Sequence, residues 1–95
     1  MDKASPEMCC PACGYDLGFK PWDGDSASFE ICPSCGIQFG YTDAAGGDSN
    51  RRQQIYCEWR DRWIEEGMHW SSTQERPAVW DAVGQLRNIG VDIKR

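Results

Sequence analysis

The sequence predicts a small α+β protein, in which short antiparallel strands come first and two helices pack on them. Residues 28–31 and 37–41 alternate apolar and polar side chains, as half-buried strands do. Residues 51–66 contain neither proline nor glycine and repeat apolar side chains at helical spacing. The chain has 95 residues, 40% of them hydrophobic and 26% charged, which is typical of one globular domain over 1–95.

The composition divides this domain into two halves. Residues 7–41 carry five of the six cysteines, and residues 48–95 carry four of the five tryptophans. Glycine, proline, aspartate and serine are dense between residues 18 and 28, and glycine and aspartate between 42 and 48, so both segments are predicted turns or loops. We therefore expect strands joined by turns in the first half and helices that complete the core in the second.

The first helix is expected to take Ser49 or Asn50 as its N-cap, with Gln53 completing a capping box. It should end at Gly67, because glycine readily adopts the left-handed conformation that stops a helix. Its inward face is predicted to carry Ile55, Tyr56, Trp59 and Trp63.

The second helix is predicted to begin near Pro77, because proline suits a first helical turn, and to end at Asn88 or Gly90. Gly84 lowers its helix propensity. Residues 91–93 are a candidate edge strand. The inward side chains are predicted to be Val79, Trp80, Val83, Leu86 and Ile89.

One five-residue pattern occurs twice, at Cys10-Pro11-Ala12-Cys13-Gly14 and at Cys32-Pro33-Ser34-Cys35-Gly36. We call these segments CPxCG loop 1 and CPxCG loop 2. A spacing of two residues lets a tight turn direct both sulfurs to one point, and the following glycine permits a positive φ. With 18 residues between the inner cysteines, the pattern predicts a zinc ribbon. One structural zinc ion would be bound by Cys10, Cys13, Cys32 and Cys35.

Other readings of the cysteines stay open at this point. Similar loops occur in rubredoxins, which hold one iron ion, although the short intervening segment and the long helical half favour zinc. Two unconnected redox pairs are a further alternative. Cys9 could replace Cys10, but its spacing to Cys13 suits the turn less well. Cys57 is expected to be incidental, and His69 to be structural or exposed.

Several segments of the chain form a further pattern, made up of Cys10 to Tyr15, Phe29 to Gly36, Phe39-Gly40-Tyr41, Trp59-Arg60, Trp63, Trp70, Pro77, Trp80 and Gln85-Leu86. Together these segments resemble the bacterial cysteine-rich CPCC family. Ala12 departs from the family pattern, which commonly has a cysteine directly after the proline. The resemblance implies a small bacterial zinc protein and says little about its task.

Charge favours a protein partner over a nucleic acid. The net charge is −5, and zinc held by four thiolates would add about −2. The arginines at 51, 52, 60 and 62 are interleaved with acidic residues, so we expect a solvated helix face and not a phosphate-binding patch. A basic partner protein is expected to be attracted instead. The candidate interface residues are Trp22, Trp70, Asp23, Asp25, Asp43 and Asp48.

These observations favour a non-catalytic zinc-binding protein-interaction module, with an inhibitor or immunity-type protein as the suggested role. The sequence shows no nucleophile paired with a base, no phosphate-binding loop and no open metal site, so no enzymatic activity or small-molecule substrate is predicted. No secretory leader or long apolar run is present, which predicts a cytoplasmic protein with reduced thiols. A nucleic-acid-associated zinc ribbon and a rubredoxin-like electron carrier are the alternatives.

Overall fold

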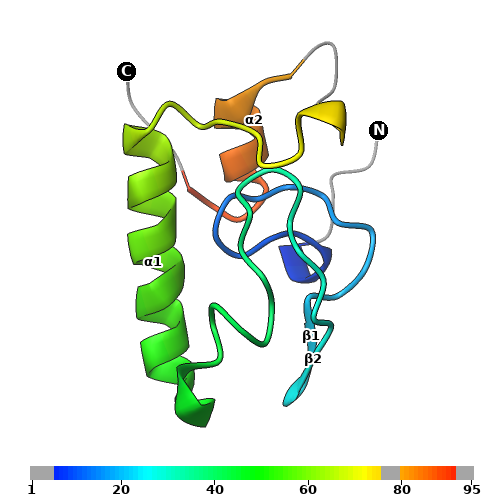
Figure 1. Ribbon diagram of the computed structural model, residues 1–95, viewed down its shortest axis with the longest axis vertical. Coiled ribbons are helices and arrows are strands. Elements are labelled where there is room, and N and C mark those ends of the chain that lie inside the picture. The colour runs from blue at the N-terminus through cyan, green and yellow to red at the C-terminus, as the bar shows by residue number, and fades with distance from the viewer. Residues whose placement is uncertain (1–5, 76–79, 92–95) are drawn as a thin grey trace.

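Two helices and one short hairpin are linked by loops in the computed structural model, which describes residues 6–75 and 80–91. The hairpin pairs β1 (Trp22–Asp23) with β2 (Ser26–Ala27), and the helices are α1 (Ser49–Glu65) and α2 (Ala82–Arg87). In Figure 1, α1 runs along one side, the hairpin lies on the other, and α2 lies near the upper end. The predicted α+β class is confirmed. The single-turn 3-10 helices are η1 (Pro6–Met8), η2 (Ala45–Gly47) and η3 (Thr73–Glu75).

The strand prediction was wrong in detail. Residues 28–31 and 37–41 meet only at an isolated antiparallel bridge between Ile31 and Gln38, and the sheet lies within the segment predicted as turns. Phe29 interrupts the first segment, because its φ of +63° lies outside the region that strands adopt. Within 37–41 the alternation holds for Ile37 and Phe39, which are fully buried, but not for Tyr41, which is 78% exposed.

The N-terminus of α1 is capped one residue earlier than predicted. Asp48 is the N-cap, and its Oδ1 accepts hydrogen bonds from the backbone N–H groups of Asn50 (3.0 Å) and Arg51 (3.2 Å). Ser49 is already the first helical residue. A carboxylate is favoured at this position, because it satisfies unpaired N–H groups at the positive end of the helix dipole.

The C-terminus of α1 is where the sequence predicts it. Gly67 has a φ of +97°, and its N–H donates to the carbonyl of Ile64 at 3.1 Å. The N–H of Met68 donates to the carbonyl of Trp63 at 2.8 Å. Together these two bonds form a Schellman motif, which satisfies carbonyls that the end of the helix leaves free.

The second helix is shorter than predicted. Pro77 lies outside the described residues, and Trp80 and Asp81 are not helical, so α2 begins at Ala82. The turn ends at Gly90, whose φ is +78°. Of the predicted inward residues, Leu86 is fully buried and three are half-buried, while Val79 is outside the described residues. The candidate edge strand at 91–93 also falls mostly outside them.

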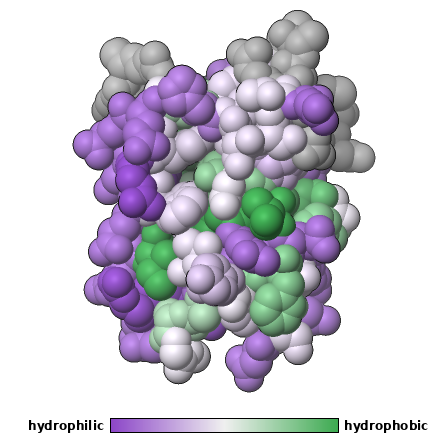
Figure 2. All heavy atoms as spheres, in the orientation of Figure 1, coloured by the Kyte–Doolittle hydropathy of each residue, from purple (hydrophilic) through white to green (hydrophobic). Residues whose placement is uncertain are grey.

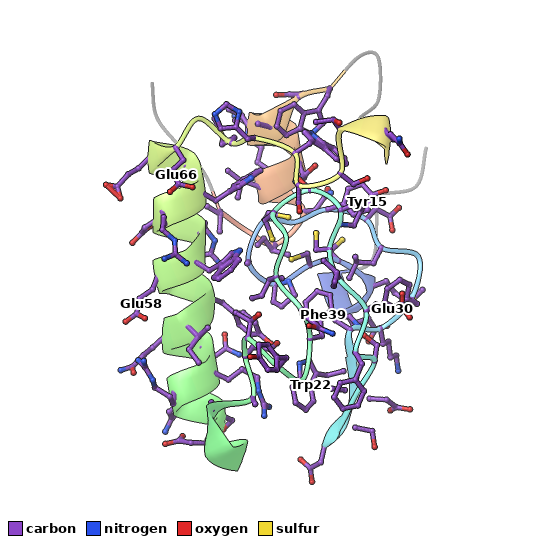
Figure 3. The ribbon with its side chains drawn as sticks, viewed as in Figure 1. Tyr15, Trp22, Glu30, Phe39, Glu58 and Glu66 are labelled. Atoms are coloured by element: carbon purple, nitrogen blue, oxygen red, sulfur yellow. The ribbon has the colours of Figure 1, made fainter. Side chains whose placement is uncertain are left out.

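The core lies between α1, α2 and the two CPxCG loops. Tyr56 and Trp63 reach it from α1, and Leu86 reaches it from α2. Trp59 and Trp80 are half-buried and pack against it. Figure 3 shows that Phe39 lies inside the molecule, whereas Glu58 and Glu66 point away from it on the outer side of α1. Within the described residues, no helix is long and apolar enough to cross a bilayer.

Trp70 belongs to this core and not to the surface, which corrects its place among the candidate interface residues. It is 6% exposed, and its ring meets those of Tyr15 and Trp80 edge-on at centroid distances of 5.3 and 5.5 Å. Such edge-on pairs stabilise aromatic clusters beyond the apolar area that they bury. The sequence places Trp70 just after a helix end, and the chain then turns it inward onto the loops.

Candidate metal centre

The two CPxCG loops have the same backbone hydrogen bonds. In loop 1 the N–H of Gly14 donates to the carbonyl of Cys10, and the N–H of Cys10 donates to the carbonyl of Tyr15, both at 2.8 Å. The equivalent bonds of loop 2 are both 2.9 Å. The loop glycines have φ values of +84° and +81°, as the turn requires. The repeated sequence therefore folds into a repeated structure.

The two loop glycines differ in the space around them, so the same substitution is expected to affect them differently. A Cβ added at Gly14 would overlap the backbone carbonyl oxygen of Gln85. At Gly36 the nearest atoms are the Ser71 Oγ and Cβ, at 3.0 and 3.2 Å; the Oγ can rotate away, and a shift of a few tenths of an ångström relieves the Cβ. Both alanine variants should lose about 1–2 kcal/mol for the positive φ. Gly14→Ala should lose about 1–3 kcal/mol more, because α2 must shift. Urea unfolding of the metal-loaded variants measures this, and equal losses would contradict it.

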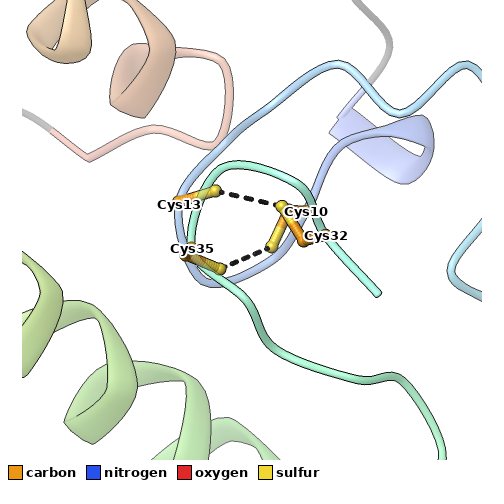
Figure 4. Close-up of side chains that lie close together, drawn as sticks. All are labelled: Cys10, Cys13, Cys32 and Cys35. Atoms are coloured by element: carbon orange, nitrogen blue, oxygen red, sulfur yellow. Dashed lines mark hydrogen bonds between the residues drawn. The ribbon is translucent and has the colours of Figure 1, made fainter. Parts of the chain in front are cut away.

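The four cysteine sulfurs of the loops converge. Sγ of Cys10 lies 3.6 Å from Sγ of Cys35, and Sγ of Cys13 lies 3.6 Å from Sγ of Cys32 (Figure 4). All four sulfurs lie within 4.8 Å of one another, and all four residues are buried. A disulfide would need about 2.05 Å. A tetrahedron of thiolates around a metal at about 2.3 Å has edges of about 3.8 Å, so this cluster could hold a metal ion.

The charges in this cluster call for a cation. Burial raises the pKa of the Cys10 thiol well above its ordinary value, and hydrogen bonds with the other three sulfurs add to this. The pKa of Cys32 is lowered, because hydrogen bonds with Cys10, Cys13 and Cys35 stabilise its thiolate. Four negative charges in one buried cluster would repel one another, which disfavours four thiolates in the absence of a cation. A bound cation is what would let all four be thiolates at once, because a coordinated thiol loses its proton.

The remaining cysteines and the histidine are not part of the cluster. Cys9 is 1% exposed and forms an isolated bridge with Asp16, but its sulfur is not among the four that converge. Cys57 is exposed on α1, as expected for an incidental cysteine. His69 is exposed beyond the end of α1.

Side chains of α1 hold both loops by their backbone carbonyls. The Arg60 guanidinium donates from Nε to the carbonyl of Ala12 at 2.7 Å and from Nη2 to that of Pro11 at 2.8 Å. The indole Nε1 of Trp59 donates to the carbonyl of Cys35 at 3.1 Å. The planar guanidinium can satisfy two adjacent carbonyls at once, which an ammonium group does less well. Arg60 is therefore an anchor of loop 1, which corrects its assignment to a solvated face.

Side chains of α2 and the following turn make the matching contacts from the other side. Gln85 is 8% exposed, and its Nε2 donates to the carbonyl of Cys13 at 3.2 Å and to the Oγ of Ser34 at 3.0 Å. The Nδ2 of Asn88 donates to the carbonyl of Gly14 at 3.0 Å. Gln85 thus joins the two loops directly. Buried carbonyls need donors, but the sequence does not show which side chains supply them.

Two more of the four arginines predicted at the surface contact tryptophan rings or backbone carbonyls of the chain. The guanidinium carbon of Arg52 lies 3.8 Å from the centre of the Trp22 ring, and its Nε donates to the carbonyl of Asp43 at 2.9 Å. Arg62 lies over Trp59 at 4.8 Å. Because these guanidinium groups lie against the chain's own tryptophan rings, they are less available to phosphates, which weakens the case for a phosphate-binding patch.

Asp43 is fully buried, so its assignment to an acidic surface was wrong. Its Oδ2 accepts from the hydroxyl of Tyr56 at 2.6 Å and from Nε1 of Trp22 at 2.9 Å, and its Oδ1 accepts from the N–H of Gly40 at 2.6 Å. Burial, and then the bond with Asp43, raise the pKa of Tyr56. The phenol therefore stays protonated as a donor, and the carboxylate ties three segments of the chain together.

The other candidate interface residues lie where a partner could reach them. Asp23 and Asp25 in the hairpin are exposed, as is Asp48, although Asp48 also caps α1. Trp22 is half-buried. Their role at an interface stays a prediction.

Comparisons with protein-family models, with curated proteins and with solved structures find no match to this chain. Its resemblance to the CPCC family therefore stays a prediction from the residues that carry it. The function has to be argued from the metal centre and the surface.

Proposed function

We propose that this chain is a non-catalytic, zinc-binding protein-interaction module of the cytoplasm. In this proposal one zinc ion joins CPxCG loop 1 to CPxCG loop 2 as a zinc ribbon. The observation that carries it is the convergence of four buried sulfurs at spacings close to those of a tetrahedral site. Zinc fits because four thiolates in a tetrahedron are a common structural zinc site. The ligands are Cys10, Cys13, Cys32 and Cys35.

The arrangement of the ligands supports a structural role. Four thiolates would fill every position of a tetrahedral ion, which leaves none for water or substrate. Three of the four cysteines are 0% exposed, and Cys35 is 9% exposed, so a small molecule has little access to the centre. Side chains of α1 and α2 also donate hydrogen bonds to the backbone carbonyls of the two CPxCG loops, which favours a rigid metal site over one that opens to solvent.

The surface supports a basic protein as the partner. The chain has a net charge of −5, and three of its arginines are engaged in internal contacts. A negatively charged surface attracts a positively charged protein and repels phosphates. An inhibitor or immunity-type role, in which this chain covers a basic partner, fits this charge.

Metal analysis of the purified protein tests the zinc assignment. The protein should be colourless and contain one zinc ion per chain after expression with both zinc and iron supplied. A red protein with iron and a reversible one-electron couple would instead indicate a rubredoxin-like carrier. Metal-free protein with a native fold would overturn the proposal altogether.

Binding measurements test the partner class. The zinc-loaded protein should show no salt-dependent binding to duplex or single-stranded DNA or RNA. Affinity that falls steeply as salt rises would indicate phosphate contacts and favour a nucleic-acid-associated ribbon.

The Gln85 contacts predict an effect on metal retention. Gln85→Leu removes the donor that joins the Cys13 carbonyl to Ser34 but keeps the side chain's approximate size. Loss of hydrogen bonds to the residues around a metal's ligands commonly lowers metal affinity by about 10–100-fold, so we expect about a tenfold loss of zinc affinity. Competition with a chromophoric chelator measures it. Gln54→Leu, on the exposed face of α1, is the matched control and should keep full affinity. Equal affinities of the two variants would contradict a positioning role for Gln85.

A further inference from the structure

A groove of about 220 Å³ lies between residues 15–19, which form one wall, and residues 30–33, which form the other. Its lining residues Tyr15 and Glu30 lie on the opposite side of the molecule from α1 (Figure 3). Figure 2 shows hydrophobic residues on both sides of this face of the molecule. The groove is lined by Tyr15, Leu17, Phe19, Glu30, Ile31 and Pro33.

Two large apolar side chains are exposed on the segment that forms one wall of the groove or directly precedes it. Ile31 is 57% exposed, and Phe29, two residues before it, is 63% exposed. Phe29 also adopts a left-handed φ of +63°, which is costly for a bulky residue. Its ring lies so close to Gly40 that a Cβ there would come within 2.7 Å of Cε1. The chain therefore holds an apolar ring at the surface in a strained conformation that burial does not offset.

The backbone at Ile31 is free to pair with another segment. At its bridge with Gln38, the hydrogen bonds run from the N–H of Phe39 to the carbonyl of Glu30 and from the N–H of Cys32 to the carbonyl of Ile37. In such a pair the N–H and C=O of Ile31 point away from Gln38. Among the described residues, neither group of Ile31 has a hydrogen-bond partner. An extended segment could bond to both, as in β-strand addition.

The charges around the groove select the occupant. Four exposed acidic side chains lie within residues 15–31, and Lys20 is the only basic one there, so the local net charge is −4 + 1 = −3. A cationic segment would be attracted to the groove, and an anionic one repelled. Of the acidic residues, Glu30 lines the groove, Asp16 lies in sequence between the lining residues Tyr15 and Leu17, and Asp23 and Asp25 lie in the hairpin.

We infer that this groove binds an extended segment of a partner protein that carries lysine or arginine. Its backbone pairs with Ile31, its apolar side chains contact Leu17, Phe29 and Ile31, and its basic side chains face Glu30. The inference deepens the proposed function, because it rests on an interaction role and assigns that role to one surface.

Random short peptides displayed on phage provide the probe, with the zinc-loaded full chain as bait. Enriched peptides should combine basic and apolar residues, and their affinity should fall as salt rises. Ile31→Glu should weaken them at least about tenfold, because it replaces the exposed apolar side chain at the pairing position with a negative charge. The matched control is Ile55→Glu on α1, outside the groove, which should bind them as the original chain does. Unchanged zinc content and tryptophan fluorescence would show that both variants are folded.

Several outcomes would overturn the inference. No enrichment, enrichment of acidic peptides, or peptides that Ile31→Glu binds unchanged would each do so. A concentration-dependent dimer that Ile31→Glu abolishes would assign the groove to a second copy of the chain instead. Peptides that bind with unchanged affinity to Ile31→Glu would leave the proposed interaction role intact while excluding this groove. Absence of zinc from the purified protein would contradict the proposed function separately.

Discussion

Replacing Cys32 with serine is expected to unfold the loop half of the protein even with zinc in excess. Cys32 is fully buried in the four-sulfur cluster, and three thiolates cannot close the tetrahedron. Structural zinc sites contribute about 10–16 kcal/mol of apparent free energy near neutral pH, whereas a whole domain is stable by about 5–15 kcal/mol. Zinc content, near-ultraviolet circular dichroism and tryptophan fluorescence measure the loss. Treating the original protein with a strong chelator should give the same spectra.

Two further cysteines provide the controls. Cys57→Ser changes an exposed thiol on α1 and should leave stability and zinc content unchanged. Cys9→Ser changes a buried thiol beside the cluster, so it should cost some stability while one zinc ion is retained. Loss of zinc from Cys9→Ser together with its retention by Cys32→Ser would show that the ligand set is wrong.

The second large effect is expected for Asp43→Ala. This change leaves the hydroxyl of Tyr56, the Nε1 of Trp22 and the N–H of Gly40 without their acceptor. A buried donor left unpaired costs about 1–3 kcal/mol, and these three share one site, so we expect a total loss of about 3–5 kcal/mol. Urea unfolding of the zinc-loaded protein measures it.

Asp25→Ala is the matched control, because the sequence alone treats the two aspartates alike. Asp25 is exposed in the hairpin, and its removal should change stability by less than about 0.5 kcal/mol. Asp43→Asn keeps an acceptor oxygen and should fall between the two. Equal stabilities of the alanine variants at 43 and 25 would contradict the buried network.

The features that the sequence predicts well are those that a few neighbouring residues determine. A CPxCG loop sets its own turn through its cysteine spacing and its glycine, so both loops and their shared centre follow from the repeated pattern. Gly67 stops α1 for the same local reason. The cap of α1 is Asp48 and not the predicted Ser49 or Asn50, because several adjacent polar residues can satisfy the same N–H groups and only the backbone conformation selects among them.

The features that the sequence could not predict depend on residues far apart in the chain. An aspartate in a loop reads as solvated, and Asp43 is buried only because three donors from different segments meet it. Arg60 reads as part of a charged helix face, yet two carbonyls of loop 1 lie within its reach. The prediction of a strand at 28–31 was wrong because Phe29 adopts a left-handed conformation, which its residue type does not predict.

The hydrogen bonds of α2 to loop 1 constrain how the protein can be made in the cell. The bonds from Gln85 to Cys13 and from Asn88 to Gly14 join residues 72 and 74 positions apart. During translation, the first loop therefore emerges from the ribosome long before its last supports exist. Contacts so distant along the chain also slow folding, because the intervening segment must be closed first. Loop 1 is thus expected to hold its thiols loosely until Gln85 and Asn88 have emerged and packed against it.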